Sequence, residues 1–278
     1  MHLVLNKSVL LESLSFLEKI VPTRSTISLL KGIKLEADEN KLILTGNNLE
    51  VSLKAVYETD IHRPGGVILP EKFFDIIRQA PAEEIEIEMQ PGDYRAAIRS
   101  GTAEFFLYGA NTEQFPLSTA EEQWRGWTKI NFAAQELKNI LQKVHFAVSQ
   151  DESKPSFKGI LLEIKEGSLL CMASDTYRLA YLQKIFPEKV LSLPYRLLIP
   201  GRSFGEMAKM LTAGGEIVEC YFQENEIIFV YRNFVFASRL LEDQYPDLEK
   251  AFPQGYATKI TVSTDLLEDT VNRASLLA

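Results

Sequence analysis

Apolar residues recur at three- and four-residue spacing in four segments of the chain. In the first of them, Leu10, Leu14 and Leu17 are the regular positions. This spacing places the apolar side chains on one face of an α-helix. The second segment follows Pro70, and proline is favourable in the first turn of a helix. We therefore expect helices at residues 7–20, 71–80, 134–146 and 201–211.

Between these segments the apolar period falls to two. Residues 84–89 read Glu-Ile-Glu-Ile-Glu-Met, and Ile33, Leu35 and Ala37 alternate with polar residues in the same way. This alternation predicts half-buried antiparallel strands, with one face toward the core and one toward solvent. Further strands are expected at 49–55, 159–164, 169–173 and 226–232. Two helices among several strands in each half predict an α+β fold.

The opening segment recurs twice along the chain. Residues 3–21 align with 130–148 and with 260–278 without a gap, so that Leu3, Ile130 and Ile260 share one position. The same spacing of 130 residues separates Pro70 from Pro200 and Phe115-Pro116 from Tyr245-Pro246. A period this long indicates tandem domains of one topology. We expect domain one at 1–120, domain two at 128–253, and the start of an incomplete third domain at 257–278.

A complete third domain would carry the chain to roughly 380 residues, so the 278-residue sequence looks truncated. Its 46% hydrophobic and 24% charged residues are ordinary for a globular chain. No apolar run approaches the length of a membrane span, and no signal peptide precedes the first strand. Cys171 and Cys220 are the only cysteines, in no metal or redox spacing. They suit a reducing cytoplasm and are expected to be buried thiols.

The net charge of −8 argues against a simple basic nucleic-acid-binding protein. The charge is unevenly distributed, because the four helical segments carry eight basic and six acidic residues and the remainder of the chain carries −10. Ordinary solvated helix faces would show a charge difference of this size as well. The difference supports a positively charged helical surface only because it recurs in both halves of the chain. The helical cations that we take as candidates for DNA contact are Lys72, Arg78, Lys138, Lys143, Arg202 and Lys209.

Several ordered motifs connect the chain to a known family. They lie at residues 99–101, 146–155, 159–163, 173–180, 199–202 and 238–247. The segment 173–180 reads Ala-Ser-Asp-Thr-Tyr-Arg-Leu-Ala, and 238–247 reads Ser-Arg-Leu-Leu-Glu-Asp-Gln-Tyr-Pro-Asp. In these motifs the chain resembles the bacterial β sliding clamp, the processivity subunit of DNA polymerase III, over all 278 residues.

The resemblance implies a ring of two three-domain subunits, with helices lining the central hole and sheets forming the rim. Such a homodimer encircles double-stranded DNA without sequence specificity, so its lining needs only weak attraction to phosphate. Arg24 matches a DNA-contacting arginine on the loop after the first helix. Gln150 and Lys154 match the corresponding loop of the second domain, where relatives contact the duplex or a single strand.

The resemblance also implies a hydrophobic cleft that receives short linear peptides. The expected partners are the polymerase III alpha subunit, the clamp loader delta subunit, other polymerases and repair proteins. The second-domain wall would comprise Phe157, Ser174, Thr176, Tyr177, Arg178, Leu179, Pro246, Lys250 and Ala251. Thr176 stands where the family usually has glycine, and Ala251 where it has a larger aliphatic residue. Without the resemblance, Phe157 and Leu179 would be interpreted as core residues and Arg178 as half of a salt bridge.

For the dimer interface, the resemblance implies that Phe105 of the first domain meets Leu276 and Leu277 of a third domain. Glu104 replaces a residue that is basic in some relatives, which alters the expected charge pattern there. As written, the chain is not expected to close a ring. We expect it to require no cofactor and no metal, and to work in the cytoplasm without a membrane.

Two other classes of function are alternatives for this sequence. Catalysis is disfavoured because the chain has no glycine-rich phosphate loop and no nucleophile elbow, and His2, His62 and His145 are scattered. Asp175 and Arg178 form a common spacing that is usually structural, so no catalytic residue is assigned. The alternative that stays open is a repeat scaffold that binds partner peptides without encircling DNA. Retention on circular but not on linear DNA would separate the two.

Overall fold

The computed structural model describes residues 1–90, 92–116, 123–165, 167–185, 194–212, 214–248, 251–253 and 255–277. The chain divides into two compact units, Met1–Tyr245 and Pro246–Ala278. The second unit contains the α-helix α5 (Thr264–Ser275). All described strands belong to the first unit.

The first repeat of the large unit contains two α-helices and nine strands. In chain order they are β1 (His2–Asn6), α1 (Lys7–Ile20), β2 (Ile33–Asp38), β3 (Lys41–Asn47), β4 (Val51–Glu58), β5 (Ile61–Arg63), β6 (Gly65–Leu69), α2 (Lys72–Gln79), β7 (Glu84–Met89), β8 (Arg95–Ser100) and β9 (Ala103–Tyr108). Short 3₁₀ helices lie at Ser28–Lys31 and Thr112–Gln114.

The described strands and helices of the second repeat follow the same order as β1–β4, β6–β9, α1 and α2 of the first. They are β10 (Thr128–Ala133), α3 (Ala134–Val144), β11 (Gly159–Lys165), β12 (Ser168–Ser174), β13 (Leu179–Ile185), β14 (Tyr195–Pro200), α4 (Gly201–Met210), β15 (Ile217–Phe222), β16 (Glu226–Tyr231) and β17 (Phe234–Arg239). Short 3₁₀ helices lie at Gln123–Gly126, His145–Ala147 and Pro155–Lys158.

The two repeats have one topology, as the sequence period predicts. Strand order β1-β7-β8-β9 corresponds to β10-β15-β16-β17, and β4-β3-β2-β6 corresponds to β13-β12-β11-β14. The repeats are joined where β17 pairs antiparallel with β4, which produces a continuous eight-stranded sheet. Six described strands lie at sheet edges, namely β5, β6, β9, β10, β13 and β14.

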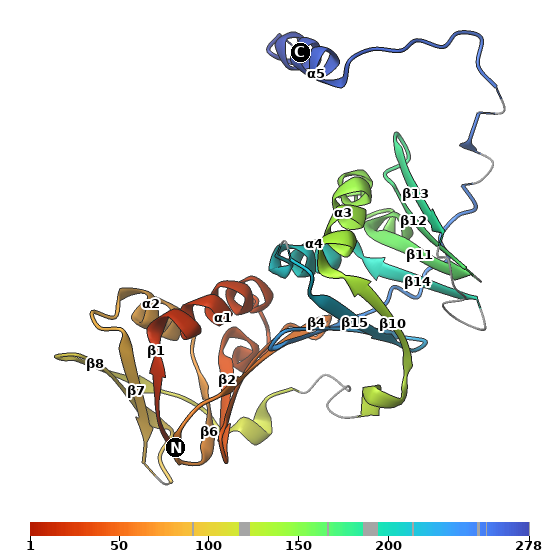
Figure 1. The fold of residues 1–278 in the computed structure, drawn as a ribbon. Helices are drawn as coiled ribbons and strands as arrows, with labels where there is room; N and C mark the ends of the chain where they lie inside the picture. The colour runs from red at the N-terminus through yellow and green to blue at the C-terminus, as the bar shows by residue number, and fades with distance from the viewer. Residues whose placement is uncertain are drawn as a thin grey trace. The chain divides into compact units, whose positions relative to one another are not determined.

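The helices form close to the bounds that the apolar spacing predicts. Helix α1 occupies Lys7–Ile20, and the Asn6 side chain caps it by accepting a hydrogen bond from the Ser8 backbone N–H. Helix α3 ends at Val144, two residues before the predicted end, and continues as a 3₁₀ turn. Within the first unit, α1 contacts α2, α3 contacts α4, and α1 also contacts α4 (Figure 1). The helices of both repeats therefore form neighbouring surfaces.

Two strand predictions need correction. Leu49 is not part of a strand, because β4 begins at Val51 and Leu49 lies in a turn with φ +75°. The expectation of half-buried strands is wrong for β11 and β12, which bury residues on both faces, among them Leu161 and Met172. The segment after β17 continues along this sheet, since the Leu241 backbone N–H donates to the carbonyl of Leu198 on β14.

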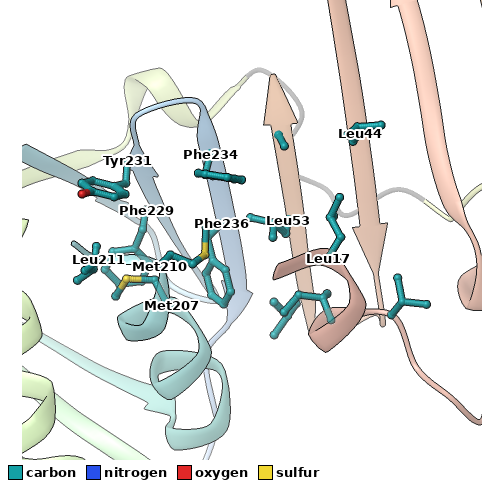
Figure 2. Close-up of a cluster of buried hydrophobic side chains, with 14 of the residues drawn as sticks. Leu17, Leu44, Leu53, Met207, Met210, Leu211, Phe229, Tyr231, Phe234 and Phe236 are labelled. Carbon is teal, nitrogen blue, oxygen red and sulfur yellow. The ribbon is translucent and has the colours of Figure 1, made fainter. Parts of the chain in front are cut away.

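An apolar core crosses the boundary between the repeats (Figure 2). Phe236 of β17 is 1% exposed and pairs with Leu53 of β4. From the second repeat, α4 contributes Met207 and Met210; from the first, α1 contributes Leu17. Beside them the rings of Phe16 and Phe234 meet edge to face at 5.4 Å. The joint between the repeats is therefore a packed core rather than a flexible linker.

Both cysteines are buried, as predicted. Burial raises the pKa of the Cys171 thiol to about 12 and raises the pKa of Cys220 as well. In the described part of the chain, no cluster of three or more His, Cys, Asp or Glu residues is placed to hold a metal ion. No described helix is long and apolar enough to cross a membrane.

Candidate functional site

The candidate surface is formed by exposed cations on the helices. Lys72 on α2, Lys143 on α3 and Arg202 on α4 are exposed. No carboxylate of the described residues pairs with any of the three. Their positive charge is therefore available to an anionic partner.

Two other predicted cations are paired with carboxylates. The Arg78 guanidinium donates to Glu18 Oε2 at 2.8 Å and to Asp75 Oδ1 at 3.1 Å. Lys209 Nζ lies 2.7 Å from Glu206 Oε1 on the same helix. These side chains are exposed, so the ion pairs are weak and a phosphate could compete for the cations. Because carboxylates lie beside them, Arg78 and Lys209 nonetheless add less positive charge to the helical surface than the count of basic residues implies.

Lys138 has a hydrogen-bond partner that the charge count does not show. Its Nζ donates at 2.8 Å to the carbonyl of Leu211, the C-cap residue of α4. In the first repeat, Lys7 Nζ donates at 2.6 Å to the carbonyl of Ala80, the C-cap residue of α2. In each repeat a lysine of the first helix thus caps the second, where the helix dipole favours a cation.

The three predicted DNA-contacting loop residues differ in their surroundings. Arg24 and Gln150 are exposed. Lys154 Nζ instead donates to Thr176 Oγ1 at 3.0 Å, lies 3.9 Å from Asp151 Oδ2, and sits 5.8 Å from the centre of the Tyr177 ring. The structure therefore brings one predicted DNA-contacting residue together with two residues of the predicted peptide cleft.

The cleft turn at residues 174–178 is held by its own side chains. Ser174 Oγ accepts from the Thr176 N–H at 3.1 Å and donates to the Arg178 carbonyl at 2.9 Å. Asp175 Oδ1 accepts from the N–H groups of Tyr177 and Arg178, and Asp175 Oδ2 accepts from Arg178 Nε at 2.8 Å. The Arg178 backbone N–H and the other donors lower the pKa of Asp175. The salt bridge expected of Arg178 is thus present, inside this turn.

Thr176 adopts a backbone conformation that normally requires glycine. Its φ is +79°, and a β-branched residue in this region is strained. The hydrogen bonds of the turn fix this conformation, since both neighbours of Thr176 are anchored. The threonine that stands in place of the family's usual glycine therefore has a strained backbone.

One aromatic residue that the sequence prediction did not include packs against the predicted cleft residue Phe157. The ring of Phe157 packs 5.7 Å from that of Tyr245, which is 5% exposed. Burial raises the pKa of Tyr245 to about 12. The repeat alignment of Tyr245 with buried Phe115 was the available signal for its burial.

The remaining cleft residues are placed as follows. Leu179 is half-buried at the start of β13, and the Tyr177 side chain is 94% exposed. Pro246 and Ala251 belong to the second unit, and Lys250 lies outside the described residues. One further contact was not expected: the Arg178 guanidinium lies 5.7 Å from the ring centre of Phe146, which is 56% exposed.

The predicted interface residues lie on an edge strand and on α5. Phe105 is half-buried on β9 and occupies the topological position of Phe236 on β17. Leu276 and Leu277 follow α5 in the second unit and are 81% and 97% exposed. Glu104 on β9 pairs with Arg99 at 2.8 Å.

Two family models match the chain. The N-terminal domain of the DNA polymerase III beta subunit matches residues 1–119, and its central domain matches residues 131–247. The matched ranges follow the two repeats. Together they leave only the linker and the last part of the chain unmatched.

Named relatives agree with the family models. The beta sliding clamp of Bacillus subtilis is 33% identical over 100% of this chain and 75% of that protein. A Staphylococcus aureus beta sliding clamp is 32% identical over 100% of this chain and 74% of its own length.

Solved structures give the same result. The crystal structure of the Bacillus subtilis DNA polymerase sliding clamp matches with a TM-score of 0.93 at 33% identity, over 100% of this chain and 74% of that one. A Pseudomonas aeruginosa DnaN sliding clamp bound to griselimycin matches with a TM-score of 0.91 at 25% identity, over 100% and 74% of the two chains. The chain therefore belongs to the DNA polymerase III beta subunit family, the DNA sliding clamps, which act in DNA replication as non-catalytic processivity subunits.

Proposed function

We propose that the helical surface of this chain faces duplex DNA and holds it through weak contacts to phosphate. The observation that carries this proposal is the repeated topology. Two α+β repeats of one topology share a continuous sheet through β17 and β4, and their helices α1 and α4 are in contact. This arrangement supports a curved assembly with helices inside and sheets outside. Tethering a polymerase to such a ring keeps it at high effective concentration near the primer end.

Within this surface, the exposed cations Lys72, Lys143 and Arg202 are the principal phosphate contacts. Arg24, Gln150 and Lys154 add contacts from the loops. Arg78 and Lys209 contribute less, because each would exchange a carboxylate for a phosphate. Lys138 contributes least, because its amine is bonded to the Leu211 carbonyl. A lining of this kind binds weakly, which suits sliding.

The second surface is the peptide cleft. Its second-domain wall comprises Phe157, Ser174, Thr176, Tyr177, Arg178 and Leu179. An aromatic side beside fixed polar groups suits an extended peptide with apolar anchors. We assign to this cleft the polymerase III alpha subunit, the clamp loader delta subunit, other polymerases and repair proteins.

Ring closure would use the edge strand β9. In the chain itself, the topologically equivalent strand β17 adds to β4 of the neighbouring repeat. By the same geometry, β9 adds to a third domain of a second copy, and Phe105 meets Leu276 and Leu277 there. We propose a homodimer for the full-length form, clamp domains at 1–120 and 128–253, a third domain beginning at 257, and action in the cytoplasm.

The DNA surface is tested by the salt dependence of duplex binding. Lys143→Met and Arg202→Met should each weaken binding and reduce the slope of log K against log salt by about one. The control is Lys41→Met at the β2–β3 turn, outside the helices, which should leave the slope unchanged. An equal effect of all three substitutions would reject the assignment of this surface.

A further inference from the structure

Lys154 lies where the two proposed surfaces meet. It shares one loop with Gln150 on the DNA side and Phe157 on the cleft side. Its amine reaches across to the turn at 174–178, where it donates to Thr176 Oγ1 at 3.0 Å and lies over the Tyr177 ring at 5.8 Å. Its other neighbour is Asp151 Oδ2 at 3.9 Å. One ammonium group thus connects the loop to the turn.

The backbone on both sides of this bond is fixed. In the loop, the Ser149 N–H donates to the Phe157 carbonyl at 2.9 Å, and the Lys154 N–H donates to the Asp151 carbonyl at 3.2 Å. The Asp151 side chain accepts from both the backbone N–H and the hydroxyl of Ser153. Because the backbone is held, the flexible part is the four-carbon stem of Lys154, whose side chain is 36% exposed.

The ammonium carries three N–H donors, but it can serve both surfaces at once only if both acceptors lie within hydrogen-bond distance of it. A contact with a phosphate oxygen requires an N···O distance of about 2.7–2.9 Å. Reaching a duplex on the helical side would take the amine away from the hydroxyl of Thr176. A phosphate is a charged acceptor and binds an ammonium more strongly than a neutral hydroxyl does. A phosphate of duplex DNA would therefore bind the Lys154 amine in preference to Thr176, but only after the Lys154–Thr176 bond has been broken.

Thr176 accepts this hydrogen bond although its backbone is strained. A glycine would adopt φ +79° without strain but would offer no hydroxyl. The threonine provides the acceptor for Lys154 although its backbone conformation is unfavourable. The hydroxyl is the feature of residue 176 that a glycine could not supply.

We propose that Thr176 is a positioning residue that holds Lys154 on the cleft turn and releases it to a phosphate when duplex DNA binds. This inference rests on the DNA surface and the cleft proposed above. The Thr176 hydroxyl then weakens the contact between Lys154 and DNA. When DNA binds, it removes the Lys154 amine from the turn that carries Thr176 and Tyr177. By linkage, a peptide that stabilises the Lys154–Thr176 bond weakens duplex binding by the same factor.

The test is a double-mutant cycle on the full chain. The dissociation constant of a short fluorescein-labelled duplex is measured by anisotropy for the wild type, Thr176→Val, Lys154→Met and the double variant. Valine keeps the shape and branching of threonine but removes the acceptor. Thr176→Val should tighten duplex binding roughly three- to five-fold when Lys154 is present. The same substitution should have no effect in the Lys154→Met background, and Thr176→Ser, which keeps the hydroxyl, should bind like the wild type.

Two results would overturn the inference: Thr176→Val has no effect in either background, or it changes affinity equally in both. An equal change would mean that residue 176 acts through the shape of the loop and not through the amine. Lys143→Met and Arg202→Met separate this failure from that of the DNA surface. If they weaken binding while the cycle shows no coupling, only the role of Thr176 fails; if they also leave binding unchanged, the proposed DNA surface fails with it.

Discussion

At the scale of single residues, the strain at Thr176 leads to a stability prediction. Thr176→Gly should raise the free energy of unfolding by about 1 kcal/mol, because glycine adopts the positive φ without a penalty. The loss of the Lys154 bond at this exposed site offsets only part of the gain. Urea unfolding monitored by circular dichroism measures the change. Thr176→Ala, which keeps the penalty for a Cβ, is the control and should not be stabilising.

A second prediction at this scale concerns acid stability. Arg99 bonds to Glu88 Oε2 at 3.0 Å and to Glu104 Oε1 at 2.8 Å, and lies 3.4 Å from Glu86 Oε2. The hydrogen bond from Arg99 is the main cause that lowers the pKa of Glu88 below its usual value. A lowered folded-state pKa stabilises the protein above the unfolded pKa of about 4.3, and this stabilisation is lost as the pH falls.

Arg99→Met should therefore lower the melting temperature at pH 7 and flatten its dependence on pH between pH 5 and pH 3. Thermal melts of both proteins across this range provide the measurement. Lys41→Met, which removes a cation elsewhere, should leave the shape of the pH profile unchanged. A parallel drop for wild type and Arg99→Met would show that Arg99 does not set the acid sensitivity.

At the scale of elements, sequence reasoning worked where the apolar pattern alone decides the structure. The heptad-like spacing of Leu10, Leu14 and Leu17 fixed the extent of α1, since burial of that stripe is what stabilises the helix. The alternation in residues 84–89 fixed β7 for the same reason. Where a residue's environment comes from another element, the pattern could not show it. Strand β12 is different, because residues 169–173 are a continuous apolar run and both faces of the strand are buried, so the expectation of a half-buried strand was wrong there.

The same limit applies to the candidate site. Counting charges found the helical cations but could not distinguish Lys143, which is exposed, from Lys138, whose amine reaches a helix end 73 residues away. It also could not show that Lys154 bonds to Thr176, 22 residues away. Long-range partners of flexible side chains leave no signal in local spacing. The repeat alignment did carry such information for Tyr245, through its counterpart Phe115.

The caps formed by Lys138 and Lys7 lead to a prediction for the helix pairs. Lys138→Met should destabilise the protein by about 1 kcal/mol, because it removes a charged donor from the C-terminus of α4. Lys143→Met, one and a half turns along the same helix, should stay within about 0.5 kcal/mol of the wild type. Chemical denaturation of both variants measures the difference. Equal stabilities would mean that the cap contributes nothing.

At the scale of the whole molecule, the packed joint between the repeats fixes the helices of one repeat relative to those of the other. Phe236 is buried where β17 meets β4, while Phe105 holds the equivalent position on the edge strand β9 and is only half-buried. Phe236→Ala should cost about 3–4 kcal/mol, because it opens a cavity in the shared core. Phe105→Ala is the matched control and should cost clearly less. Calorimetry of the two variants gives the comparison, and equal losses would contradict a packed joint.

The central claim is that the helical surface, and not the outer face of the sheets, lies against duplex DNA. The most direct measurement places a photo-crosslinking benzoylphenylalanine at Lys143 or Arg202 on the helices, and at Tyr181 or Phe106, which are exposed on strands. Each variant is irradiated with a labelled duplex at low salt. If the helices face the duplex, crosslinks form from positions 143 and 202 and only background appears from 181 and 106. Equal or stronger crosslinking from the strand positions would contradict it.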